Sequence, residues 1–250
     1  HPDLAGAPAG QPLGHAGGAG DDGAARDHGT FVAGILSARR GAMAPAICPG
    51  CTLLSRPLFR DGGPRGYGAP SATPRALAEA VRDCIDAGAR VVNISAAVAG
   101  TAIQAEPVLQ GALDGAARRD VIVVAAAGNR RSVGGTVVTS HPWVIPVMGY
   151  DGRGRPLGHT NLGGAIGRRG LGGPGDRVLS LGADGGPLTM SGSSAAAPFV
   201  TGAIALLWSE APRASATQVK LAVTGASTPR RATVVPPLLD AWAAYRAMKG

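Results

Sequence analysis

The run VIVVAAAGN, at residues 121 to 129, contains no polar side chain before its last residue. A continuous apolar stretch of this length is typical of a strand that is covered on both faces. Further short strands are predicted at 51–59, 90–95, 143–150 and 176–183. Helices are predicted at 30–38, 74–87, 105–119, 194–211, 218–223 and 238–248. This alternation indicates an α/β fold with a mostly parallel central sheet and helices on both faces.

Glycine is unusually frequent in this chain, with 40 residues in 250, whereas about 7% is the average share. Many glycines cluster in stretches predicted to be surface loops, at 14–23, 61–68, 134–135, 152–175 and 182–186. Residues 1–26 are also predicted to be loop. The sequence shows no internal repeat and no domain boundary, which favours a single domain over residues 1–250. The chain begins with histidine, so we expect a processed product or a fragment of a longer protein.

The formal net charge of +8 raises the question of nucleic-acid binding. The arginines are scattered in pairs, and few aromatic residues lie among them to stack on bases. We therefore expect no nucleic-acid partner. No apolar segment reaches the roughly 18 residues of a membrane span, and no signal sequence opens the chain.

The three cysteines, Cys48, Cys51 and Cys84, do not form a disulfide framework. Cys48-Pro-Gly-Cys51 has the spacing of redox and zinc sites, but no second pair supplies the other two zinc ligands. The simplest interpretation is a tight Pro-Gly turn, and a local disulfide stays open. Residues 39–47 offer no carboxylate or amide to bind calcium. We predict no metal and no cofactor.

Three polar residues stand where an α/β sheet places its sites, at strand ends and helix starts. They are His28, before a predicted helix, Asn129, after the buried strand, and Ser194, at the start of the most apolar helix. A serine hydroxyl becomes a nucleophile when a base such as histidine takes its proton. The helix N-terminus and an asparagine amide favour the negative charge that then develops.

His28 and Ser194 also have purely structural interpretations. A lone histidine before a helix is most often a capping or core residue, and a serine at a helix start is most often an N-cap.

A nucleotide-binding α/β protein is suggested by GAGDDG at 18–23, but this motif follows loop sequence instead of a strand. An α/β-hydrolase is disfavoured because Ser194 lacks the Gly-x-Ser-x-Gly motif.

Several separated motifs together resemble the subtilisin-like serine proteases. The residues that carry the resemblance are HGTFVAG (28–34), VVNIS (91–95), VIVVAAAGN (121–129), MSGSSAAAPFVTGAIALL (190–207), HPDL (1–4), HPWVIPV (141–147) and GPGDRVLSL (173–181). Their order and spacing are similar to those of the family over residues 1 to about 210. The segment ICPGCTLLSRPLF (47–59) is most similar to the subtilases associated with cyanobactin-type peptide maturation.

The resemblance implies a serine endopeptidase that cleaves a peptide or protein substrate. It makes His28 the general base, Ser194 the nucleophile, and Asn129 with the Ser194 backbone N–H the oxyanion hole. It implies that the substrate backbone lies between the strand at 93–98 and the segment 126–128. The substrate-binding residues it assigns are Ser95, Ala96, Ala97, Ala127 and Gly128. Secretion suits the general family, whereas the peptide-maturation subgroup is cytoplasmic.

The chain departs from the family at the aspartate that orients the histidine. The strand that carries it should end several residues before HPDL, so we expect an N-terminally incomplete domain with little activity. Asp27 is a poor substitute because neighbouring side chains point in different directions, and Asp3, Asp21 and Asp22 are expected to be solvated. The alternative is a non-catalytic subtilase-fold protein that binds peptides.

Two further departures concern specificity. Ser95-Ala96-Ala97-Val98 stands where the family usually has Ser-Leu-Gly-Gly, and its added methyl groups should narrow the cleft. Arg130 directly follows Asn129, which favours substrates with acidic residues near the cut. The oligomeric state has no signature in the sequence.

Overall fold

The computed structural model describes residues 1–5, 23–58, 72–96, 106–226 and 233–250. Its central element is a four-stranded sheet with the order β1-β2-β3-β4, in which all neighbouring strands are parallel. The strands are β1 (Val91–Ile94), β2 (Ile122–Ala126), β3 (Ile145–Tyr150) and β4 (Leu171–Pro174). The predicted mostly parallel sheet is confirmed.

Alternate residues of β2 contact opposite layers of helices. Val123 and Ala125 belong to one hydrophobic core, whereas Ile122 and Val124 belong to another on the other face of the sheet. Side chains alternate between the two faces of a strand, so a strand with both faces covered must be apolar throughout. This arrangement explains the uninterrupted apolar run in the sequence.

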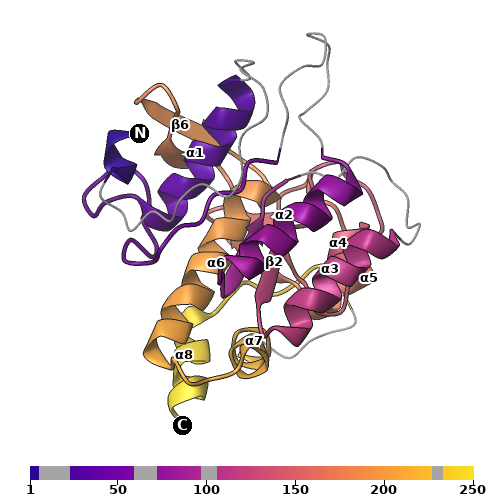
Figure 1. Ribbon diagram of the computed structural model, residues 1–250. Helices are drawn as coiled ribbons and strands as arrows, with labels where there is room; N and C mark the ends of the chain where they lie inside the picture. Colours follow the sequence, from indigo (N-terminus) through magenta and orange to yellow (C-terminus); the bar gives the residue numbers. More distant parts are fainter. Residues whose placement is uncertain (6–22, 59–71, 97–105, 227–232) are drawn as a thin grey trace.

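The first layer of helices consists of α2 (Pro74–Asp86), α3 (Pro107–Arg118), α4 (Val137–Ser140) and α5 (Gly164–Arg169). These four helices lie together on the right-hand side of Figure 1. α2 begins where the Thr73 side chain accepts a hydrogen bond from the Ala76 N–H and Pro74 occupies the first turn, which is a favourable helix start.

The second layer consists of α6 (Ser193–Glu210), α7 (Ala216–Gly225) and α8 (Ala241–Lys249). α6 packs against all four strands of the central sheet, and α7 and α8 lie at its C-terminal end (Figure 1). α6 is apolar on most of its circumference, because it lies between the sheet on one side and other helices on the other.

α1 (Gly23–Ser37) packs against α6 and against a separate antiparallel hairpin, formed by β5 (Val178–Leu181) and β6 (Pro187–Met190). Gly34 permits this contact, because a Cβ atom there would lie 2.4 Å from the Ser180 Oγ. The Ser180 hydroxyl instead donates a hydrogen bond to the Phe31 carbonyl, at 2.8 Å. The remaining regular element is a 3-10 helix at Pro2–Leu4.

Three predictions about the elements were wrong in whole or in part. Residues 1–26, predicted to be loop, contain the 3-10 helix at Pro2–Leu4 and the first residues of α1. Residues 51–58 form no strand and contain a single β-bridge at Leu53, and residue 59 lies outside the described residues. Apolar composition favours a strand, but a strand also needs a neighbour with which to form a hydrogen-bonded ladder. The glycine-rich stretch 152–175, predicted to be loop, contains α5 and β4.

The glycines of β4 serve close packing rather than a turn. A Cβ atom on Gly172 would lie 2.4 Å from the Tyr150 ring, and one on Gly173 would lie 3.0 Å from the Ala196 carbonyl oxygen of α6. A strand that approaches its neighbours this closely needs glycine, so here glycine marks a buried strand.

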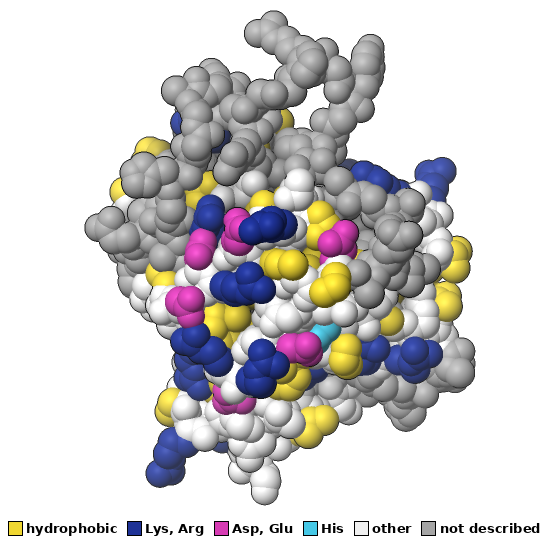
Figure 2. Space-filling view, turned by 45° about the vertical axis from the view of Figure 1, so that its right-hand side comes forward, with side chains coloured by type: hydrophobic (Ala, Val, Ile, Leu, Met, Phe, Trp, Pro, Cys, Tyr) yellow, Lys and Arg dark blue, Asp and Glu magenta, His cyan; other side chains and the backbone are white. Residues whose placement is uncertain are grey.

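Charged side chains of both signs are interspersed on the face shown in Figure 2. The ion pairs of α2 and its surroundings include Arg56–Asp83, Arg75–Glu79 and Arg119–Asp86. Nucleic-acid binding requires a continuous basic surface. The described residues on this face do not form one. Within the described ranges, no helix is long and apolar enough to cross a membrane.

Candidate active site

Ser194 lies in the first turn of α6 and is half-buried. The helix begins after Gly192, which has a φ of +135° and donates its N–H to the Gly175 carbonyl at 2.7 Å. No acceptor among the described residues takes the Ser194 N–H. The first N–H groups of a helix carry partial positive charge, so the Ser194 N–H is available to a negatively charged oxygen.

Asn129 follows β2 and is held against the start of α6 by Ser193. The Asn129 Oδ1 accepts hydrogen bonds from the Ser193 N–H at 2.9 Å and from the Ser193 hydroxyl at 3.0 Å. Because the carboxamide oxygen is engaged in this way, the Nδ2 group remains as the free donor. Gly192 makes room for it, since a Cβ atom there would lie 2.5 Å from the Asn129 Nδ2.

His28 lies inside α1 instead of before it, which corrects the predicted helix start at residue 30. The apolar periodicity begins only at Phe31, but Ala24, Ala25 and Arg26 are good helix formers and extend the helix towards its N-terminus. His28, Phe31 and Ile35 share one face of α1 because they are three and four residues apart.

This face of α1 is directed towards the start of α6. Phe31 and Ile35 form a hydrophobic cluster with Ala195, the neighbour of Ser194. Burial lowers the pKa of the His28 imidazole below its ordinary value of 6.5. The imidazole is therefore neutral at neutral pH, as a general base must be. It forms no hydrogen bond with Ser194 or with any other described residue.

The carboxylates near His28 in the sequence have other partners. The Asp27 Oδ1 accepts a hydrogen bond from the Ala183 N–H at 2.8 Å, which ties α1 to the β5–β6 hairpin. Asp3 was predicted to be solvated, and this was wrong: it is 9% exposed and forms an ion pair with Arg39. The ion pair with Arg39 and the 3-10 helix at Pro2–Leu4 together hold the Asp3 side chain out of solvent. Asp21 and Asp22 lie outside the described residues.

Ser95 is linked to the nucleophile candidate by a chain of hydrogen bonds. Its hydroxyl donates to the Ser194 carbonyl at 3.1 Å and accepts from the Asn93 Nδ2 at 2.8 Å. The Asn93 Oδ1 in turn accepts from the Thr201 hydroxyl at 2.9 Å, and this hydroxyl shares its hydrogen with the Ala197 carbonyl at 3.0 Å. These hydrogen bonds connect the end of β1 with two successive turns of α6.

The other residues assigned to substrate binding differ in exposure. Ala96 is half-buried and packs against the core of α2 and α3, and Ala97 lies outside the described residues. The Ala127 side chain is buried with Met148 and Tyr150, so only its backbone is available. The backbone of Gly128 contacts Ser193 and Asn161, through N–H and C=O respectively.

Asn161 holds the loop that follows Asn129 and was not singled out from the sequence. Its Oδ1 accepts hydrogen bonds from the Arg130 N–H at 2.8 Å and the Ser132 N–H at 3.2 Å. It lies in the stretch 152–175, where the abundance of glycine obscured it. Ser193, Asn93 and Thr201 were also missed as supporting residues, and only Ser193 carried a signal, its position beside Ser194.

The first turn of α6 thus carries the Ser194 hydroxyl and the Ser194 N–H, and the Asn129 Nδ2 lies beside Gly192, after which this helix begins. Such donors stabilise an oxyanion next to the hydroxyl. The described residues include no group of three or more His, Cys, Asp or Glu side chains that could hold a metal ion.

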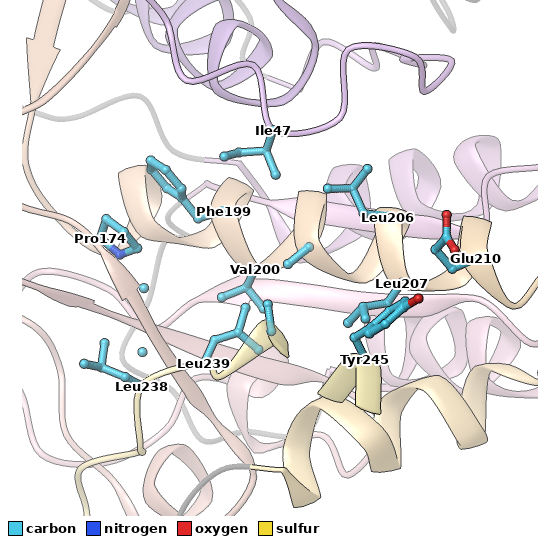
Figure 3. Close-up of a pocket in the computed structure, with 14 residues that line it drawn as sticks. Ile47, Pro174, Phe199, Val200, Leu206, Leu207, Glu210, Leu238, Leu239 and Tyr245 are labelled. Atoms are coloured by element: carbon cyan, nitrogen blue, oxygen red, sulfur yellow. The ribbon is translucent and has the colours of Figure 1, made fainter. Parts of the chain in front are cut away.

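An apolar cavity of about 510 Å³ lies elsewhere on α6 (Figure 3). The side chains around it come from α6, α8 and the segments next to them, and include Phe199, Leu206 and Tyr245. None of His28, Asn129 and Ser194 lines it, so this cavity is separate from the candidate active site.

The parallel sheet between two helical layers and the serine at the start of α6 define the subtilisin-like α/β class. The chain belongs to the subtilase family, whose family model matches residues 14–236.

Among curated proteins, mycosin-4 of Mycobacterium tuberculosis (strain ATCC 25618 / H37Rv) is 34% identical over 233 residues, which cover 77% of this chain and 50% of mycosin-4. The chain spans about half the length of the mycosins that it matches. Subtilisin DY of Bacillus licheniformis is 28% identical over 206 residues, covering 80% of this chain and 70% of that protein.

Among solved structures, a mutant of the protease domain of PatA matches with a TM-score of 0.89 at 30% identity, covering 100% of this chain and 90% of that chain. The prenylagaramide maturation protease PagA matches with a TM-score of 0.85 at 27% identity, covering 99% and 88%.

Proposed function

We propose that this chain is the catalytic domain of a serine endopeptidase with Ser194 as its nucleophile. The observation that carries the proposal is the position of Asn129, whose carboxamide is oriented by Ser193 beside the first turn of α6. Asn129 Nδ2 and the Ser194 N–H then bind the oxyanion that forms when the Ser194 Oγ attacks a peptide carbonyl. Membership of the subtilase family supports these roles.

His28 serves as the general base in this proposal. It takes the proton from the Ser194 hydroxyl during the attack and gives it to the leaving amine. Its lowered pKa keeps it neutral before the reaction, and its position on the face of α1 that packs beside Ala195 supports the assignment.

We further propose that residues 1–250 form one peptidase domain that is N-terminally incomplete, and that an aspartate upstream of His1 orients His28. Two observations support this. No described carboxylate contacts the imidazole, and β1 lies at an edge of the central sheet, with no described strand along its outer side. An added strand there would bring a side chain to the same end of the sheet as Asn129.

The proposed substrate is a precursor peptide. The solved relatives named as maturation proteases, PagA and PatA, support this choice. In this proposal the peptide lies beside Ser95 and Ala96 on one side and Ala127 and Gly128 on the other. The second candidate is a non-catalytic peptide-binding protein of the same fold, and a parent gene that encodes no aspartate upstream of His1 would favour it.

Labelling with a fluorophosphonate tests the proposal. The chain is prepared alone and with the residues that precede His1 in its gene, each with a Ser194→Ala control. We expect an adduct on Ser194 in the extended protein, and none in the control. An extended protein that binds a peptide in calorimetry but takes up no label would be the non-catalytic protein instead.

A further inference from the structure

The Cys-Pro-Gly-Cys segment at 48–51 forms the tight turn that the sequence predicts. The Cys51 N–H donates a hydrogen bond to the Cys48 carbonyl at 2.9 Å, and both thiols are free. The first and fourth Cα atoms of such a turn are less than about 7 Å apart, and disulfides join Cα atoms separated by about 4.4 to 6.8 Å. The backbone therefore already holds the two cysteines at a separation that a disulfide can bridge.

The two thiols interact with each other and differ in their access to solvent. Burial raises the pKa of the Cys48 thiol to about 12, and the negative charge of a Cys51 thiolate and a hydrogen bond with the Cys51 side chain raise it further towards this value. Cys48 is 3% exposed, whereas Cys51 is half-buried. A reagent in solution therefore meets Cys51 first.

The turn lies between the helix that carries His28 and the helix that carries Ser194. The N–H groups of Ile47 and Cys48 donate to the carbonyls of Ile35 and Leu36 at the end of α1, both at 2.8 Å. On α6, a Cβ atom at Gly202 would lie 2.6 Å from the Ile47 Cγ2 and 3.6 Å from the Cys48 Sγ. Figure 3 shows Ile47 directed towards α6 at the edge of the apolar cavity.

We propose that Cys48 and Cys51 are a reversible redox pair, whose disulfide locks this turn in the position that it holds between α1 and α6. The turn geometry, the contact between the thiols and the greater solvent access of Cys51 than of Cys48 carry the proposal. It does not depend on the role of Ser194.

The oxidant in this proposal is a small-molecule disulfide such as oxidised glutathione. The Cys51 thiolate attacks one of its sulfur atoms, which forms a mixed disulfide and releases one glutathione thiolate. Cys48 loses its proton to solvent and attacks the Cys51 sulfur, which releases the second thiolate. Two electrons pass from the cysteines to the oxidant and two protons leave the protein. Excess thiol reverses both steps.

The test uses the Cys84→Ser protein, so that only the pair remains, and measures intact mass after treatment with oxidised glutathione and denaturing alkylation with a maleimide. We expect the mass to fall by two hydrogen atoms, with no maleimide and no glutathione attached. The added substitution Cys48→Ser should leave one glutathione on Cys51. With Cys51→Ser instead, Cys48 should carry no glutathione, because it is buried in the native protein, and should take up one maleimide after denaturation. Two maleimides, or an unresolved glutathione on the Cys84→Ser protein, would overturn the proposal.

A second measurement shows whether the disulfide preserves the native turn. Oxidation should raise the midpoint of thermal unfolding of the Cys84→Ser protein by a few degrees. The protein with the added Cys48→Ser substitution should show no rise. An unchanged or lower midpoint after disulfide formation would contradict the proposed lock, because it would mean that the bond distorts the turn.

Discussion

The Asn129 side chain accepts two hydrogen bonds through its Oδ1, and both come from Ser193, the residue before the proposed nucleophile. The Ser193 hydroxyl also accepts the Gly128 N–H at 3.0 Å. One buried serine thus joins the end of β2 to the start of α6. This contact fixes the direction in which the Asn129 Nδ2 points, so the donor that we propose for the oxyanion is already oriented in the free protein.

Ser193→Ala removes one of these two bonds to Asn129. A hydrogen bond of this kind contributes about 1 kcal/mol, so we expect kcat to fall roughly fivefold to tenfold with little change in KM. Asn129→Ala removes the donor itself, and its expected loss is about 10²- to 10³-fold. Steady-state kinetics on a model peptide measures both variants. Ser193→Thr keeps the hydroxyl and serves as the control, and a Thr variant as slow as the Ala variant would argue against this role.

Gly192→Ala should impair activity more than stability. Its Cβ atom would meet the Asn129 Nδ2 at 2.5 Å, and its φ is +135°. Gly185 has a φ of +91° but open space around it, so Gly185→Ala is the matched control for backbone strain alone. We expect both variants to lose about 1 to 2 kcal/mol of stability in urea unfolding. Only Gly192→Ala should lose kcat, by roughly 10²-fold if the oxyanion donor is displaced.

The lowered pKa of His28 predicts a specific pH dependence. The acid limb of kcat/KM should have its midpoint below pH 6.5, because only the neutral imidazole acts as a base. The folded state binds the His28 proton less well than the unfolded state does. The contribution of His28 to the free energy of unfolding is therefore complete above pH 6.5. It is lost as the pH falls from 6.5 through the folded pKa. Titration of the His28 ring by NMR measures the value directly, and a midpoint at or above 6.5 would contradict the burial argument. In His28→Gln this part of the pH dependence of stability should disappear.

The order of the major elements was predictable because each carries a local pattern. The apolar runs of β2 and α6 follow from burial on more than one side, and the periodicity of α2 and α3 follows from burial on one face. β4 was not predictable, since Gly172 and Gly173 are selected by the close approach of Tyr150 and α6, which is a tertiary contact. The strand predicted at 51–59 was wrong for the opposite reason. Its composition favours a strand, but composition says nothing about a pairing partner.

The proposed catalytic residues were identified from the sequence because their motifs are contiguous. Their supporting residues were not, since Ser193, Asn93 and Asn161 act through contacts between segments that are far apart in the chain. The burial of Asp3 and its ion pair with Arg39 were also not predictable from the sequence. Its partner Arg39 lies 36 residues away, and no local pattern connects an aspartate in a proline-rich start with an arginine after a helix.

Arg130 should bias the protein towards acidic substrates. The loop backbone is held by Asn161, and neither Arg130 nor Arg131 forms an ion pair with a described residue. An exposed ion pair with a peptide carboxylate is worth up to about 1 kcal/mol, so Arg130→Glu should lower kcat/KM for peptides with Asp or Glu near the cut by roughly fivefold. A peptide panel with matched acidic and basic members measures the change. Arg213→Glu makes the same change of charge at another exposed position and should leave the ratio of kcat/KM for acidic to basic peptides unchanged. If both variants changed this ratio equally, the preference would come from the net charge of the protein and not from Arg130.

Thr201 should influence Ser194 although it lies two turns further along α6. Its hydroxyl donates to the Asn93 Oδ1, and Asn93 orients the Ser95 hydroxyl that bonds to the Ser194 carbonyl. Thr201→Val leaves the Asn93 Oδ1 without its donor, which costs about 1 to 3 kcal/mol, and it frees Ser95 to rotate. We expect lower stability together with a several-fold fall in kcat at unchanged KM. Thr201→Ser retains the hydroxyl and should restore kcat even if the lost methyl group keeps the stability below that of the native protein. If kcat in both variants followed stability alone, the hydrogen-bond chain would have only a structural role.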